Sequence, residues 1–118
     1  MKRFGAMLDM SRNAVMKVEE VKNFAKILHS FGYNTLLLYT EDTYVVDGEP
    51  YFGYMRGRYT KDELKELVTY CESLGIEMIP CIQTLAHLNQ IFRWQAYAPI
   101  HDCDDILFVG EERTYELI

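Results

Sequence analysis

The chain is organised around the stretch Ile76-Glu-Met-Ile-Pro-Cys-Ile-Gln-Thr-Leu-Ala-His-Leu-Asn-Gln-Ile-Phe-Arg-Trp94, an apolar run whose second half turns polar and aromatic. A near-continuous apolar run is typical of a strand that is buried on both faces of a parallel sheet. Ligands of proteins built on such sheets bind just beyond the carboxyl ends of the strands. We therefore predict a binding site from the side chains that follow the apolar half: Gln83, Thr84, His87, Asn89 and Trp94.

Two further strands and two helices are predicted upstream of this stretch. Short apolar runs predict strands over residues 4–10 and 35–39, and the second run has no polar alternation, which again favours burial on both faces. Apolar residues that recur at steps of three and four predict a helix over residues 17–31. A capping box, Thr60-Lys-Asp-Glu63, begins the next helix, and Gly32 and Gly75 end the two helices.

The joint between helix and strand occurs twice with similar residues. His29-Ser-Phe-Gly-Tyr-Asn-Thr-Leu36 is followed 43 residues later by Glu72-Ser-Leu-Gly-Ile-Glu-Met-Ile79. Helices that alternate with strands in this way predict consecutive βα units, parallel strands and right-handed crossovers. The predicted fold class is therefore α/β, with about three parallel strands and alternating helices.

The remaining segments are less regular. Residues 44–59 form a loop of turn-forming residues that carries five aromatic side chains, and loops of this length are usually functional or lid-like. After Trp94 the chain is predicted to be irregular over residues 95–105. A short apolar run at 106–109 and the opening turns of a helix at 110–118 follow it.

The composition narrows the class of protein and its partners. A chain of 118 residues with 49% apolar residues predicts one small folded domain. The formal net charge is -6 and the acids are spread along the chain, which argues against a nucleic-acid partner, and no apolar run is long enough to span a membrane. Cys71, Cys81 and Cys103 lack paired spacing and are predicted to be free thiols in a reducing compartment. The free thiols favour a cytoplasmic protein. We expect no metal site, because no further ligands join His101 and Cys103, and we expect no cofactor.

The predicted sheet is incomplete on its own. Three parallel strands leave both edge strands unpaired, and two helices cover only one face. The opposite faces of the strands are also apolar, as the strands of a closed barrel are. We expect this chain either to be the front part of something longer or to complete its sheet by self-association.

Three segments at the predicted strand ends carry a family resemblance. They are Met7-Leu-Asp-Met-Ser-Arg12, Leu38-Tyr-Thr-Glu-Asp-Thr43 and Ile79-Pro-Cys-Ile-Gln-Thr-Leu-Ala-His87. In order and spacing they resemble the first three strand ends of glycoside hydrolase family 20, the β-N-acetylhexosaminidases, and the resemblance covers nearly the whole chain. It implies a partial (β/α)8 TIM barrel, with residues 1–118 as the N-terminal third of a truncated catalytic domain.

The resemblance also implies an activity. Members of this family remove terminal N-acetylglucosamine or N-acetylgalactosamine from glycans, and the 2-acetamido group of the substrate acts as the nucleophile. The family's Asp-Glu pair follows a fourth strand, which is expected beyond residue 118. The pairs Asp104-Asp105 and Glu111-Glu112 do not fit that pattern. We therefore expect the 118-residue chain to be inactive alone.

The candidate binding residues follow from the three segments. Charged acceptors bind sugar hydroxyls well, so Glu41 and Asp42 are candidates, and the family places a histidine where His87 lies. The family often has an arginine before the first-strand glycine; here Phe4 precedes Gly5, so hydroxyl recognition is expected from Arg12 or Glu41 instead. The full set expected to bind substrate or support the acid is Asp9, Arg12, Glu41, Asp42, Gln83, His87, Asn89 and Trp94.

Several of these residues have an equally plain structural explanation. Asp9 could pair with Arg12, Asn89 could cap a short helix, and Trp94 could be a core residue. The segment Arg56-Gly-Arg58 lies between aromatic residues but is interpreted as a solvated loop or an ion pair, because the chain is acidic.

Overall fold

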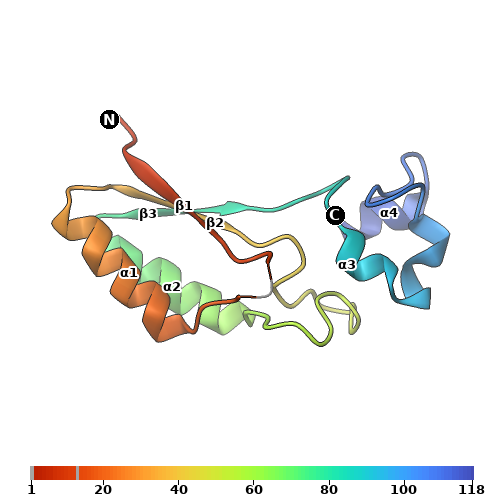
Figure 1. The fold of residues 1–118 in the computed structure, drawn as a ribbon, viewed down its shortest axis with the longest axis horizontal. Coiled ribbons are helices and arrows are strands. Elements are labelled where there is room, and N and C mark those ends of the chain that lie inside the picture. Colours follow the sequence, from red (N-terminus) through yellow and green to blue (C-terminus); the bar gives the residue numbers. More distant parts are fainter. Residues whose placement is uncertain (1, 13) are drawn as a thin grey trace.

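A parallel three-stranded sheet forms the first half of the molecule. The computed structural model describes residues 2–12 and 14–118. Strands β1 (Gly5–Asp9), β2 (Thr35–Tyr39) and β3 (Glu77–Cys81) pair in the order β1-β2-β3. Helices α1 (Val18–Ser30) and α2 (Lys61–Ser73) connect them and lie on the same face of the sheet (Figure 1). The predicted α/β fold with three parallel strands and one covered face is confirmed.

The main core lies between the sheet and these two helices. Leu36 and Leu38 of β2 face the helices and are buried, as is Leu67 of α2. Burial of each such leucine contributes about 1.5–3 kcal/mol. The buried residues of this core are Met10, Val21, Ala25, Leu28, Leu36, Leu38, Tyr59, Leu67, Cys71 and Ile76.

Both long helices end at a glycine, and α2 begins with the predicted capping box. Gly32 and Gly75 have φ angles of 78° and 71°, a conformation that glycine adopts without the Cβ penalty of other residues. The backbone N–H of Glu63 donates to Thr60 Oγ1 at 3.2 Å, and the Glu63 carboxylate accepts from the Thr60 N–H at 2.8 Å. The local sequence signals at these helix ends are therefore confirmed.

The other face of the sheet is open. Met7, Leu37 and Ile79 share one level of the parallel register on this face. Met7 is 56% exposed, and Leu37 and Ile79 are half-buried. The prediction that β3 is buried on both faces is wrong for this chain, because α1 and α2 cover only one face of the sheet and no residue of β3 is fully buried.

A second, smaller core forms where residues 82–118 pack against the aromatic loop 44–59. This part contains α3 (Asn89–Phe92), the 3-10 helix η1 (Gln95–Ile100) and α4 (Glu112–Leu117), and it extends from the sheet in Figure 1. Its buried residues are Phe52, Leu88, Ile91, Tyr97, Ile100 and Leu107.

One prediction for this region needs correction. The segment predicted to be irregular contains η1, because Tyr97 and Ile100 anchor a short helical turn in the second core. The apolar run 106–109 forms a single antiparallel bridge, Leu107 with His101, and only Leu107 is buried. Among residues 2–12 and 14–118, no helix has the length and apolar character that crossing a membrane requires.

Candidate functional site

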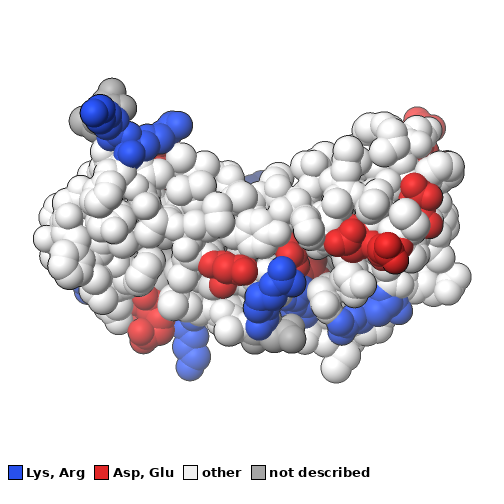
Figure 2. Space-filling view, turned by 45° about the horizontal axis from the view of Figure 1, so that its top comes forward, with Lys and Arg blue, Asp and Glu red and all other residues white. Residues whose placement is uncertain are grey.

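The carboxyl ends of the three strands meet at one edge of the open sheet face. The parallel register places Asp9, Tyr39 and Cys81 at the same level. Glu41 lies two positions after Tyr39, and Gln83 lies two positions after Cys81. Figure 2 shows a shallow hollow between the sheet half and the C-terminal half of the molecule, with acidic and basic side chains side by side near its margin.

A chain of hydrogen bonds links the ends of β2 and β3. The Gln83 side-chain amide donates to Tyr39 Oη at 2.8 Å, and the Tyr39 hydroxyl donates to Glu41 Oε1 at 3.2 Å. Burial raises the pKa of Tyr39, so the phenol remains a donor at neutral pH. Glu41 is only 4% exposed and has a φ angle of 49°. A non-glycine residue in this conformation costs about 1–3 kcal/mol, and such strain is concentrated at functional sites.

Asp9 is held in place at the end of β1 by the residue two positions later. Its Oδ1 accepts from the Ser11 backbone N–H at 2.8 Å and from the Ser11 hydroxyl at 2.6 Å. These bonds lower the pKa of Asp9, so the carboxylate is charged at neutral pH. Arg12 Nε lies 4.0 Å from Oδ2. Asp9 thus presents a partly exposed, charged oxygen at the predicted site, and its weak pairing with Arg12 does not occupy that oxygen.

Asp42 lies under the site and faces away from solvent. Its carboxylate pairs with the Arg56 guanidinium, and the two side chains are 2% and 4% exposed. Burial raises the pKa of Asp42, although attraction to Arg56 opposes this shift. In this position Asp42 contacts Arg56, so direct contact with a ligand would require Arg56 to move.

Arg56 is the residue at this edge that sequence analysis did not select. The ion-pair interpretation is confirmed for Arg56, which also donates to the Ser11 carbonyl oxygen. Arg58 instead donates to the carbonyl oxygen of Phe52 at 2.6 Å, within its own loop. No local signal distinguished the two arginines, because the partners of Arg56 lie 14 and 45 residues away in the chain.

The other three candidates lie around the second core. His87 has a φ angle of 60°, and its Nδ1 is 3.3 Å from Asp105 Oδ2. Asn89 is exposed at the first position of α3 and makes no side-chain cap bond. The Trp94 ring stacks against Tyr51 with centroids 5.7 Å apart and meets the edge of Tyr54 at 5.1 Å.

The structure therefore brings part of the predicted set together. Hydrogen bonds connect Asp9 with Asp42 through Ser11 and Arg56, and a separate set connects Glu41 with Gln83 through Tyr39. In the described part of the chain, no side-chain hydrogen bond joins His87, Asn89 or Trp94 to this group. The roles of all eight candidates in ligand binding remain predictions.

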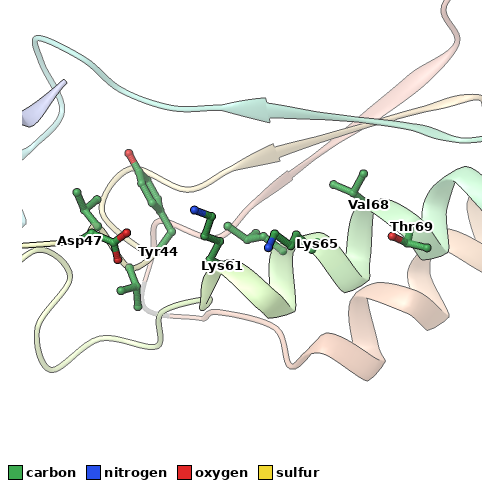
Figure 3. Close-up of a pocket in the computed structure, with 9 residues that line it drawn as sticks. Tyr44, Asp47, Lys61, Lys65, Val68 and Thr69 are labelled. Carbon is green, nitrogen blue, oxygen red and sulfur yellow. The ribbon is translucent and has the colours of Figure 1, made fainter.

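A groove lies elsewhere, beside α2. It has a volume of about 690 Å³ and lies between the start of the aromatic loop, with Tyr44 and Asp47, and the first turns of α2, with Lys61 and Lys65 (Figure 3). None of the eight candidate residues lines it. Within residues 2–12 and 14–118, no group of three His, Cys, Asp or Glu side chains is placed to hold a metal ion.

Comparison with known proteins identifies the family. No family model matches the chain. A curated beta-hexosaminidase of Akkermansia muciniphila is 31% identical, over 70% of this chain and 20% of that protein. The N-acetyl-beta-hexosaminidase of Streptomyces plicatus, solved in complex with Thio-NAglucal, is 28% identical with a TM-score of 0.79, over 95% of this chain and 27% of that one. The chain is a relative of glycoside hydrolase family 20.

The fold agrees with more distant members of family 20. The GH20 exo beta-N-acetylglucosaminidase of Vibrio harveyi, solved in complex with N-acetylglucosamine, is 18% identical and superposes with a TM-score of 0.83 over 97% of this chain. This likeness confirms the predicted partial (β/α)8 barrel. The chain spans about a fifth to a quarter of the length of these family 20 relatives.

Proposed function

We propose that this chain forms a substrate-binding wall of a β-N-acetylhexosaminidase that acts on terminal N-acetylglucosamine or N-acetylgalactosamine of glycans. The observation that carries the proposal is the cluster of polar groups at the carboxyl edge, where Asp9, Glu41 and Gln83 lie at three neighbouring strand ends. Similarity to hexosaminidases over most of this chain supports it.

Each of these groups suits recognition of sugar hydroxyls. Asp9 supplies a charged acceptor that is already fixed by Ser11, and Arg12 lies beside it as an exposed donor. Charge-assisted hydrogen bonds are about twice as strong as neutral ones. Gln83 is held by Tyr39, and its carbonyl oxygen remains available as an acceptor. Side chains that are held in place before binding lose little entropy when the sugar binds.

The chemical step is proposed to follow the substrate-assisted scheme. In that scheme the substrate's acetamido oxygen attacks the anomeric carbon while an acid protonates the leaving group. Within the 118 residues the only Asp-Glu dipeptide is Asp62-Glu63, in the first turn of α2, and Glu63 is engaged in the helix cap. We infer that these residues bind and orient the sugar and that hydrolysis requires an acid from outside them.

The purified 118-residue chain tests both parts of the proposal. Titration with N-acetylglucosamine should shift the amide NMR signals of Asp9, Glu41 and Gln83, while a chromogenic N-acetylglucosaminide should not be cleaved. Shifts confined to other regions would contradict the binding site. Turnover that is abolished by changing residues of this chain would contradict the inference that the acid lies elsewhere.

A second proposal is that the chain is a non-catalytic carbohydrate-binding or self-associating barrel fragment. The open sheet favours it, since Phe4 and Met7 of the β1 edge are 54% and 56% exposed and unpaired strand edges recruit further strands. Light scattering at several protein concentrations should then show a discrete oligomer. A monomer at all concentrations would contradict this proposal.

We also propose a cytoplasmic location, which rests on the thiols. Cys71 is buried in the main core, and Cys81 and Cys103 are free as well. Unpaired thiols suit a reducing compartment. Cell fractionation should find the protein with cytoplasmic markers, and its recovery from the extracellular fraction would contradict the proposal.

A further inference from the structure

Arg56 bonds to two segments, the one that follows β1 and the one that follows β2. One nitrogen of its guanidinium donates to the Ser11 carbonyl, and both the N–H and the hydroxyl of Ser11 hold the Asp9 carboxylate. The other nitrogen pairs with Asp42, which directly follows the strained Glu41. A single side chain from the aromatic loop therefore connects the segments that follow β1 and β2.

The Asp42–Arg56 pair is a poor source of stability. Removing two charges from water costs several kcal/mol for each ion, and a buried pair often only balances that cost. Here burial outweighs the attraction of Arg56 in its effect on Asp42. Arg56 Nε, moreover, is buried and has no hydrogen-bond partner among the described residues. An apolar pair would fill the same space without these costs, so stability alone does not explain the arginine.

We propose that Arg56 is a positioning residue that fixes the spacing between the ends of β1 and β2, so that Asp9, which would face a bound sugar, keeps a constant separation from the Tyr39–Glu41 hydrogen bond at the end of β2. The inference rests on the proposed function of this edge in carbohydrate binding. The aromatic loop 44–59 then has a role too. It braces the site, because its residue Arg56 bonds to the segments that follow β1 and β2.

The geometry of the guanidinium decides which variant is informative. Arginine presents donors in a planar fork and reaches two acceptors at once, whereas lysine is a point charge on a flexible stem. Arg56→Lys keeps the positive charge opposite Asp42 but holds only one of the two partners. Arg58→Lys is the matched control, because Arg58 belongs to the same loop and its hydrogen bonds to the described residues go to the carbonyl oxygens of Pro50 and Phe52.

Hydrogen exchange separates positioning from general stability. The Met10 N–H donates to Tyr39 O at 2.8 Å and ties β1 to β2 at the carboxyl end, next to Ser11. The Glu77 N–H donates to Asn34 O at 2.9 Å near the opposite, amino end of the sheet. Local loss of the brace should speed exchange of the Met10 amide alone, whereas a general loss of stability should speed both amides.

The experiment compares the full 118-residue wild type, Arg56→Lys and Arg58→Lys. We expect Arg56→Lys to exchange the Met10 amide about tenfold faster with little change at Glu77, and to bind N-acetylglucosamine about tenfold more weakly. Arg58→Lys should stay within about twofold of wild type in both measurements. In Arg56→Ala, added guanidinium should restore both quantities, and ammonium should not. If Arg56→Ala does not fold, the lysine variant alone decides.

One set of results would refute the positioning role of Arg56, and a different result would refute carbohydrate binding by this chain. An unchanged Met10 amide in Arg56→Lys, equal effects in Arg58→Lys, or equal acceleration at Met10 and Glu77 would each refute the positioning role. If the wild type does not bind N-acetylglucosamine, the proposed function fails for this chain, and the exchange comparison still decides whether Arg56 holds the strand ends.

Discussion

At the scale of single residues, the site depends on how acidic side chains are restrained. Asp9 is charged because Ser11 donates two hydrogen bonds to it, and Glu41 is buried in a left-handed turn with Tyr39 as its donor. Asp42 pairs with Arg56 below them. Three carboxylates close in sequence or space thus have different environments, and only Asp9 offers a charged oxygen at the surface.

The restraint on Asp9 predicts a pH dependence. Its pKa in the folded chain is lower than the value of about 3.9 expected for an unfolded chain. The folded state is therefore favoured above that value, and this contribution is lost as the pH falls through the lower, folded pKa. Asp9→Asn should be less stable than wild type to urea at pH 7, with the difference shrinking as the pH falls below about 3.9. Ser11→Ala should show the same trend, and a difference that grows on acidification would contradict it.

At the scale of elements, the two long helices begin differently. Thr60 caps α2 with a reciprocal bond to Glu63, but Lys17 at the start of α1 makes no side-chain cap bond. The backbone at Lys17 is extended, with φ -64° and ψ 151°, as a capping residue requires.

These helix starts give a paired prediction of opposite sign. Thr60→Ala should lower the free energy of unfolding by about 0.5–2 kcal/mol, because the Glu63 N–H loses its acceptor. Lys17→Ser should raise it by about 1 kcal/mol, because a hydroxyl would accept from the first turn of α1. Urea denaturation of the two variants measures both effects, and Lys17→Ala, which adds no acceptor, is the control for loss of the lysine.

Local signals account for most of the elements that sequence analysis predicted. The bounds of β2 agree residue for residue, and the capping box and the helix-ending glycines lie where expected, because these features depend on neighbours within a few positions. The prediction for β3 was wrong, since an apolar sequence indicates a preference for burial but not whether another layer covers the strand. Arg56 could not be predicted as a residue of the site, because its partners Asp42 and Ser11 are set by how a loop folds back on two strand ends.

At the scale of the whole molecule, the sheet is covered on one face only. Met7 is more than half exposed on the open face, between Gly5 and Asp9 of the edge strand β1. If the chain self-associates, this face and the β1 edge are the surfaces that contact a second copy.

A matched pair of variants tests that surface. Met7→Lys places a charge on the open face and should reduce any oligomer seen by light scattering, because a buried unpaired ammonium is costly. Met55→Lys is the control, since Met55 is 82% exposed in the aromatic loop and away from the sheet. Equal loss of oligomer in both variants would indicate a general effect of charge on solubility.

The aromatic loop contributes to both cores, and this has a consequence for cooperativity. Tyr59 is buried with the sheet and helices, while Phe52, seven positions earlier, is buried with residues 82–118. The main core and the second core can therefore open separately, and the aromatic loop joins them because it contributes a buried residue to each. When the second core opens, the loop loses the packing of Phe52, and the order of the binding edge, which the loop contacts through Arg56, becomes thermodynamically linked to that core.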